Sequence, residues 1–254
     1  KSFSPIEILF IRFLIGYATL WLVYPHQLKP AEKKQELCFA AAGLCGVTLY
    51  YLMENMALTY TLASNVGVII SIAPFFTAIF SFFLRKGDKP GKRFFLGFVM
   101  AMAGICLISG SSGAALSLNP LGDVLAIGAA IIWAVYSLLT RKIGDFGYHV
   151  VQATRRTFFY GLIFMIPVLS LMDFHVEAVQ LIQLSNLGNL LFLGLGASAL
   201  CFVTWNFAVK ALGAVKTSVY IYLVPVITVA ASVLILREPF TWMTGAGTVL
   251  TLIG

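Results

Sequence analysis

The stretch NMALTYTLASNVGVIISIAPFFTAIFS, residues 55–81, recurs 151 positions later as NFAVKALGAVKTSVYIYLVPVITVAAS, residues 206–232. Each copy begins with asparagine and has a proline nineteen residues further on, Pro74 in the first and Pro225 in the second. Glycines outside the stretch also match, at offsets of 151 or 150: Gly43 with Gly194, Gly97 with Gly247, and Gly104 with Gly254. Matches held at a spacing that changes by only one residue indicate an internal duplication.

The composition excludes an ordinary soluble domain. Of the 254 residues, 60% are hydrophobic and 11% are charged, and the mean hydropathy is +0.94. A soluble domain has roughly 25% charged residues, because its surface faces water. Lipid instead requires apolar side chains and backbone hydrogen bonds made within each segment, which helices provide. The sequence therefore predicts an all-α polytopic membrane protein whose partner is the lipid bilayer.

Nine apolar stretches predict membrane spans. About 20 residues of helix cover the roughly 30 Å of a bilayer's hydrocarbon core. The predicted spans are residues 5–24, 37–57, 66–84, 94–109, 121–139, 150–172, 187–209, 215–236 and 241–254. The connections between them are short, so we expect neighbouring helices to be antiparallel within one membrane domain.

The two copies differ in their number of spans, four in the first and five in the second. The span without a counterpart is 121–139, whose equivalent position lies before Lys1. We therefore expect one further helix before this sequence begins. The complete protein would then have ten helices in two repeats of five. Residues 1–113 would hold helices two to five of the first repeat, and residues 114–254 would hold the second repeat. The last span, 241–254, has only 14 residues and is expected to be cut short.

The net charge of +7 comes mainly from loops between spans, which excludes a nucleic-acid partner and predicts a topology. Counting the expected first helix, loops after helices two, four, six and eight hold twelve of the 17 basic residues: Lys29, Lys33, Lys34, Arg85, Lys86, Lys89, Lys92, Arg93, Arg141, Lys142, Lys210 and Lys216. The opposite face holds Lys1 and Arg237. Because basic loops stay in the cytoplasm, both termini of the complete protein are predicted to be cytoplasmic.

Five helices per repeat is an odd number, so the two repeats cross the membrane in opposite directions. Inverted-topology repeats are a recurrent design of secondary transporters, because the two halves can exchange equivalent conformations. The sequence thus predicts a transporter that works by alternating access, without nucleotide hydrolysis. No P-loop is present, since GAVKT at 213–217 lacks the glycine required before its lysine.

The order of these features resembles the EamA-type, ten-helix transporters of the drug/metabolite transporter superfamily. The resemblance covers nearly the whole chain and has five parts: Pro5 to Arg12, Asn55-Met56-Ala57 through Ala63 to Pro74, Asn206 through Ala214-Val215 to Pro225, Arg237-Glu238-Pro239, and the glycine-spaced helices after each copy. One departure is Arg85-Lys86-Gly87-Asp88, where an acidic turn with glutamate is common in the family. That departure concerns the geometry of this loop.

The resemblance implies an exporter of small metabolites such as amino acids, with a cavity between the two halves, in a bacterial inner (plasma) membrane. It does not select a substrate, because members carry amino acids, sugars, nucleotide sugars, nucleobases or drugs. A facilitative permease or a channel for small polar solutes is the alternative, and an intramembrane enzyme is a more remote one. One chain with two halves could enclose a cavity by itself, so a monomer would suffice.

Polar residues in the spans are the first candidates for a site, because burying them in lipid is costly. Glu54 is the one carboxylate well inside a span, and we interpret it as a proton-coupling residue; the alternative is a solvated carboxylate or a partner of Arg12. Asn55 and Asn206 occupy equivalent places. They could bind substrate, but their presence in both copies favours a hydrogen bond between helices.

Aromatic residues supply the rest of the predicted substrate cavity. Together with Asn55 and Asn206, the predicted lining residues are Tyr51, Trp133, Tyr136, Trp205, Tyr220 and Tyr222. Rings of this kind also pack between helices or form belts at the membrane interface. Trp133 lies in the middle of its span, where a belt does not explain it.

Pro74 and Pro225 lie mid-span, and each removes one backbone hydrogen bond from its helix. We interpret the pair as hinges, with static bends as the alternative. Arg12, Arg155 and Arg156 lie near helix ends, and we expect at least one of these arginines to extend toward lipid headgroups.

The sequence has no catalytic constellation, so we expect no enzymatic activity. H-E-x-x-H, G-x-S-x-G and G-x-G-D are absent, and one carboxylate cannot form an aspartyl pair. His26, His149 and His175 are scattered in loops, and the four cysteines form no C-x-x-C pair, so no metal and no cofactor is expected.

Overall fold

The computed structural model describes residues 3–29, 32–85, 91–111, 119–171, 181, 183–235, 237 and 240–254. The described chain is helical and contains no strand. Some residues named above lie outside the described residues: Lys1, Lys86, Gly87, Asp88, Lys89, His175, Glu238 and Pro239.

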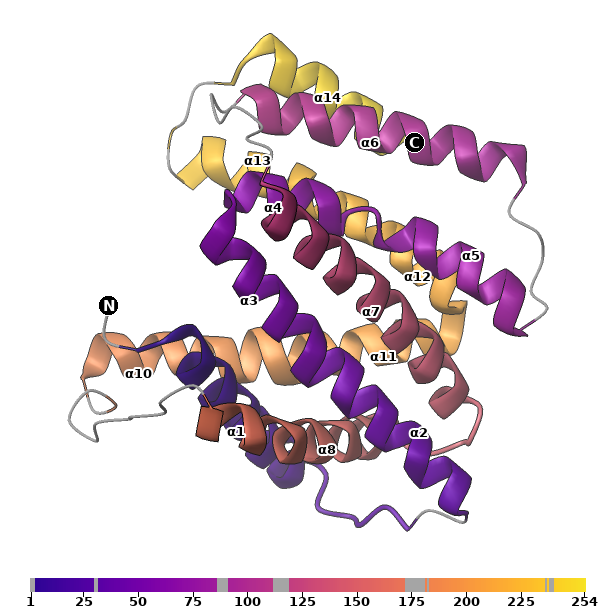
Figure 1. The fold of residues 1–254 in the computed structure, drawn as a ribbon, viewed down its shortest axis with the longest axis vertical. Helices are drawn as coiled ribbons and strands as arrows, with labels where there is room; N and C mark the ends of the chain where they lie inside the picture. Colours follow the sequence, from indigo (N-terminus) through magenta and orange to yellow (C-terminus); the bar gives the residue numbers. More distant parts are fainter. Residues whose placement is uncertain are drawn as a thin grey trace. The chain divides into compact units, whose positions relative to one another are not determined.

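The helices follow one another in the order drawn in Figure 1. They are α1 (Pro5–Val23), α2 (Lys33–Gly43), η1 (Leu44–Leu49), α3 (Tyr50–Tyr60), α4 (Ala63–Ile70), α5 (Ala73–Arg85), α6 (Lys92–Ser111), α7 (Pro120–Gly144), α8 (Val150–Leu171), α10 (Leu184–Leu191), η2 (Phe192–Leu200), α11 (Cys201–Leu212), α12 (Ala214–Val219), η3 (Tyr220–Tyr222), α13 (Leu223–Ile235) and α14 (Trp242–Ile253).

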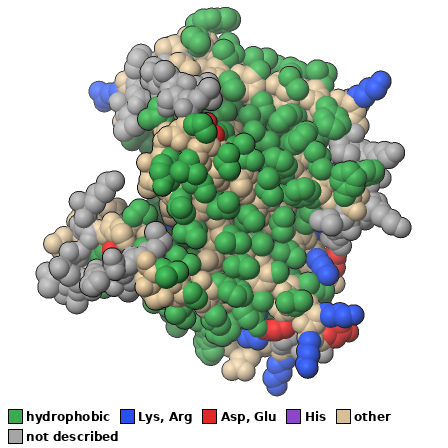
Figure 2. Space-filling model, in the orientation of Figure 1, with side chains coloured by type: hydrophobic (Ala, Val, Ile, Leu, Met, Phe, Trp, Pro, Cys, Tyr) green, Lys and Arg blue, Asp and Glu red, His purple; other side chains and the backbone are tan. Residues whose placement is uncertain are grey.

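The predicted membrane fold is confirmed, since every predicted span contains helix. In the described parts of the chain, seven helical segments are long and apolar enough to cross a membrane: Pro5–Val23, Lys33–Tyr60, Ala63–Phe83, Lys92–Gly110, Pro120–Gly144, Leu184–Leu212 and Ala214–Ile235. The remaining two predicted spans correspond to α8, which has 22 residues but carries two arginines in its first turns, and to the shorter α14. Figure 2 shows hydrophobic side chains over most of the visible surface, as a lipid-facing protein requires.

Local sequence explains where several helices begin and end. Ser4 caps α1, because its Oγ accepts a hydrogen bond from the Glu7 amide while the Ser4 amide donates to the Glu7 carboxylate. Pro5 then occupies the first helical position, where a missing N–H costs nothing. Gly213 ends α11 at a φ of 91°, a backbone conformation that residues with a Cβ rarely adopt.

The chain forms two compact units, and each takes helices from both sequence repeats. Unit 1 comprises Lys1–Leu52 and Tyr136–Gly213, and unit 2 comprises Met53–Val135 and Ala214–Gly254. In unit 1, α1 packs on η2, while α2 and η1 pack on α8. In unit 2, α6 lies along α14 and α5 packs on α12 (Figure 1). The duplicated segments therefore pair with each other and do not form a separate unit each.

Small residues allow the close helix pairs within each unit. A Cβ added to Gly43 in α2 would lie 2.6 Å from the Thr157 carbonyl oxygen and 2.7 Å from the Gly161 amide nitrogen of α8. In unit 2, a Cβ on Gly104 of α6 would lie 2.5 Å from the Gly247 carbonyl oxygen of α14. These helices approach backbone to backbone, as membrane helices with small residues do.

Two irregularities recur at equivalent places of the duplication. The π-helical segment η1, Leu44–Leu49, corresponds at the 151-residue offset to 195–200, which lies within the π-helical η2. Helix α4 ends at Ile70, three residues before α5 starts, and Pro74 is the second residue of α5. The 3₁₀ turn η3 likewise precedes α13, whose third residue is Pro225. Each proline thus starts a new helix, and the span predicted as one helix over 66–84 is two helices.

Candidate functional site

Four of the predicted cavity residues lie in unit 1: Tyr51, Tyr136, Trp205 and Asn206. Two of them are joined directly, because the Tyr136 hydroxyl donates to Asn206 Oδ1 at 2.8 Å. The Asn206 amide then donates to Thr154 Oγ1 at 2.9 Å. Tyr136 is fully buried, and Asn206 and Thr154 are buried with it. This chain of hydrogen bonds links α7, α11 and α8, which favours the helix-tying interpretation of Asn206.

The equivalent residue of the first copy, Asn55, has a different environment. It lies in the part of α3 that belongs to unit 2 and is partly exposed. Among the described residues it has no side-chain hydrogen bond, whereas Asn206 has two. Both copies thus have the asparagine, but only Asn206 joins helices through its side chain in the described structure.

A cluster of aromatic rings fixes the position of Tyr51. Phe13 of α1 is fully buried and contacts three rings edge to face: Tyr51 at 5.4 Å, Phe158 at 4.9 Å and Phe202 at 5.5 Å between centroids. Tyr136 joins the cluster through Phe202, at 5.9 Å. Edge-to-face contacts between buried rings restrict their orientation. Tyr51, at the partly exposed margin of this cluster, is therefore held in a defined position.

Arg12 lies beside Tyr51 and contacts the π-helical η2. Its Nε donates to Ser198 Oγ at 2.8 Å, and its Nη2 donates to the Tyr51 hydroxyl and to the Ala197 carbonyl oxygen at 3.4 Å each. The guanidinium carbon is 4.9 Å from the centroid of the Tyr51 ring. These contacts hold the Arg12 side chain inside unit 1.

The depth of Arg12 makes its charge notable. It is the eighth of the 19 residues of α1, about 10 Å from the first at 1.5 Å per residue. A guanidinium stays protonated in proteins, and each cation placed in lipid is costly unless it is compensated. Within the described part of the chain, no carboxylate pairs with Arg12. Arg12, Tyr51 and Ser198 therefore form a cationic, hydrogen-bonding group at membrane depth.

The remaining predicted site residues lie in unit 2. Glu54 and Trp133 are both partly exposed, in α3 and α7. Tyr220 and Tyr222 face different environments, since Tyr220 is 59% exposed and Tyr222 is 5% exposed, packed with Ala101 and Ile105. Both tyrosines lie in the 3₁₀ turn η3, but one side chain is exposed and the other is buried. Their spacing in the sequence did not predict this difference.

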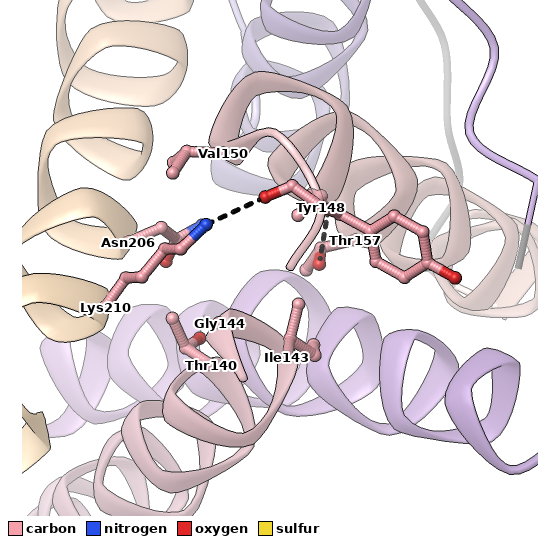
Figure 3. Close-up of a pocket in the computed structure, with 9 residues that line it drawn as sticks. Thr140, Ile143, Gly144, Tyr148, Val150, Thr157, Asn206 and Lys210 are labelled. Carbon is pink, nitrogen blue, oxygen red and sulfur yellow. Dashed lines mark hydrogen bonds between the residues drawn. The ribbon is translucent and has the colours of Figure 1, made fainter. Parts of the chain in front are cut away.

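Unit 1 also contains a small cavity that the sequence did not predict (Figure 3). It lies between α7, α8 and α11 and has about 20 Å³ accessible to the centre of a water molecule, with Thr140, Thr157, Asn206 and Lys210 among its lining residues. Lys210 Nζ closes one side by donating to the Tyr148 carbonyl oxygen at 3.0 Å. This volume suits a single water molecule rather than a metabolite. The described residues hold no group of three or more His, Cys, Asp or Glu side chains placed to bind a metal.

Comparison with known proteins places the chain among transporters. The model of the EamA-like transporter family matches residues 1–110 and again residues 120–254. An uncharacterized transporter of Archaeoglobus fulgidus is 30% identical over all of this chain and 87% of its own length. A "Probable terminal-alkyne amino-acid exporter" of Streptantibioticus cattleyicolor is 26% identical, over 85% of this chain and 68% of its own. A solved crystal structure has the same fold, with a TM-score of 0.78 at 19% identity, covering 98% of this chain and 85% of the other.

Proposed function

The chain belongs to the EamA-like transporter family, and we propose that it exports small metabolites such as amino acids by alternating access between its two repeats. The observation that carries this proposal is the double family match, with one match in each half of the chain. The same family unit occurs twice, as the duplicated sequence requires. The odd number of helices expected in each repeat predicts that the two repeats are inverted in the membrane, and inverted repeats are characteristic of secondary transporters.

The structure supports the proposal through the symmetry of its irregular elements. The π-helical segments and the helix interruptions before Pro74 and Pro225 recur in both copies. Broken helices and π-bulges are common at functional sites, because they leave backbone groups outside the regular helical pattern. A pair of equivalent breaks suits two halves that exchange conformations. The hinge role of the prolines and the cytoplasmic position of the termini stay predictions.

The site around Arg12 supports a substrate with a carboxylate. Charge-assisted hydrogen bonds between a guanidinium and a carboxylate are among the strong polar contacts in proteins. Arg12 brings that charge to membrane depth, next to the hydroxyls of Tyr51 and Ser198. An amino acid has the matching group, and the relative from Streptantibioticus cattleyicolor is named as an exporter of an amino acid. We therefore propose Arg12 as the contact for the substrate's carboxylate.

Counterflow in liposomes tests this function. Purified protein is expected to take up a labelled amino acid saturably. Uptake should be faster when the same unlabelled amino acid is inside the liposomes, because the binding site of a carrier then returns to the outer face with substrate bound. A channel gives no such acceleration, so its absence would contradict the alternating-access proposal. The amine that lacks the carboxylate should be carried at least about tenfold more slowly, since it cannot pair with Arg12. Equal transport of amine and amino acid would contradict only the role of Arg12.

We propose that Glu54 binds the coupling proton. It is partly exposed and lies six residues before the end of α3, about 9 Å from Tyr60 along the helix. Glu54→Gln keeps the shape but cannot titrate, so it is expected to abolish accumulation driven by a pH gradient while counterflow continues. Glu32→Gln, the same change at the exposed residue before α2, should accumulate substrate as the wild type does. Full pH-driven accumulation by the Glu54 variant would remove this residue from the mechanism.

A further inference from the structure

A polar pocket in unit 1 lies where α1 ends and α8 begins, apart from the Arg12 site. It has about 260 Å³ accessible to the centre of a water molecule. Its lining residues are Tyr17, Trp21, Gln27, Leu28, Gln152, Arg155, Arg156 and Phe159. The described lining residues include two arginines, two glutamines and no carboxylate, so the pocket is suited to an anion.

Arg155 gives this pocket a fixed and unneutralised charge. The residue is 6% exposed, and its Nη1 and Nη2 each donate at 2.6 Å, to the carbonyl oxygens of Tyr24 and His26. Because a guanidinium has five N–H groups, three remain for another partner. The described residues offer no carboxylate to Arg155. The two carbonyl bonds therefore hold the guanidinium in place without cancelling its charge.

The neighbouring polar groups add donors but no further net charge. Arg156 forms an ion pair with Glu36, and the Arg156 Nε donates a hydrogen bond to Glu36 Oε1 at 2.8 Å. Gln152 Nε2 donates to the His26 carbonyl oxygen at 3.1 Å and so ties α8 to the segment after α1. The described residues thus give the pocket one excess positive charge, held in place by contacts to backbone carbonyl oxygens.

The surroundings place this pocket at the level of lipid headgroups. Trp21 lines it and is 41% exposed, and the next residues, Leu22 and Val23, are 83% and 68% exposed at the last turn of α1. Tryptophan is enriched where a membrane helix meets the headgroups, and exposed leucine and valine at that end face lipid. Basic pockets between membrane helices at this level bind anionic headgroups.

We propose that this pocket binds a phosphate group at the membrane surface, with Arg155 as its charged contact. An anionic phospholipid of the adjacent leaflet and a soluble phosphate are the two sources of that chemistry. The charge pattern of the loops predicts that this surface is the cytoplasmic one. The proposal does not depend on transport, because it concerns binding alone.

Gln27→Glu is the test variant. Gln27 is exposed, lines the pocket, and has no side-chain hydrogen bond among the described residues, so the substitution should leave folding unchanged. Its carboxylate would repel a phosphate in the pocket, and we expect about a tenfold loss of affinity from one like charge several ångströms away. Gln183→Glu is the matched control: it adds the same charge at the exposed start of α10 and keeps an acceptor for Asn186.

The measurement is the apparent melting temperature of the full chain in detergent. Dioleoyl phosphatidylglycerol should raise it more than an uncharged dioleoyl glycolipid, and the Gln27 variant should need about tenfold more phosphatidylglycerol than the wild type or the Gln183 variant. Inorganic phosphate is titrated at constant ionic strength in parallel. Stabilisation by phosphatidylglycerol alone assigns the lipid as source, and a Gln27-sensitive shift with phosphate as well assigns a soluble ligand. Equal responses of the Gln27 variant and the wild type to both anions would overturn the proposal.

Discussion

Gly43→Val is expected to lower the free energy of unfolding by about 3 kcal/mol, the upper part of the range for overpacking a close contact. The added Cβ would meet the Thr157 carbonyl oxygen at 2.6 Å and the Gly161 amide nitrogen at 2.7 Å. Both are backbone atoms of α8, so a side-chain rotation cannot relieve the clash. Helix α2 would have to separate from α8, which loses packing in unit 1. Unfolding in mixed micelles, followed by circular dichroism, measures the change.

Gly188→Val is the control for this substitution. Gly188 lies in α10, and no heavy atom lies within 4 Å of a Cβ added there. The same side chain should therefore change the free energy of unfolding by less than about 0.5 kcal/mol, since an exposed position away from contacts tolerates substitution. Similar losses in the two variants would show that valine in the helix, rather than the α2–α8 contact, is responsible.

Asn206→Leu is expected to lower the free energy of unfolding by about 2 kcal/mol. The change removes two buried hydrogen bonds, from the Tyr136 hydroxyl and to Thr154 Oγ1, while keeping an apolar side chain of similar size. Deleting the partner of a buried polar group costs more than the bond contributed, because that group loses its solvation as well. Mixed-micelle unfolding measures this change too.

The equivalent residue gives a control within the same chain. Asn55→Leu alters the same residue type 151 positions earlier, at a partly exposed site without a side-chain hydrogen bond among the described residues. Its effect on unfolding should stay below about 0.5 kcal/mol. If the two variants were equally destabilised, the hydrogen bonds of Asn206 would not be the cause.

The sequence alone determined the helical membrane fold, because lipid imposes one requirement on every span. Each span must be apolar for about 20 residues and must satisfy its own backbone, so composition and length suffice to find it. The prediction of a helix over 121–139, for example, falls within α7, Pro120–Gly144. The duplication was also readable, since it is a property of sequence order. Pro74 and Pro225 indicated a bend in each span, because proline removes a backbone donor, but the break of 66–84 into two helices was not predicted.

The π-helical segments η1 and η2 were not predicted. No proline lies in either, and their apolar letters are those of an ordinary helix. Segment η1 packs on α8 and segment η2 packs on α1, and both partner helices are far away in the sequence. A local change of helical pitch that follows from such packing leaves no pattern in the segment itself.

The environments of individual polar residues were decided by the tertiary structure alone. Asn55 and Asn206 are identical in type and register, yet only Asn206 is tied to Tyr136 and Thr154. Arg12 contacts Ser198, which lies 186 residues away, and nothing in the sequence around Arg12 predicts this partner. The lipid constrains each helix separately and is therefore visible in the sequence of that helix. Burial and hydrogen bonding of one side chain depend on which distant helix packs against it, and the local sequence does not contain that information.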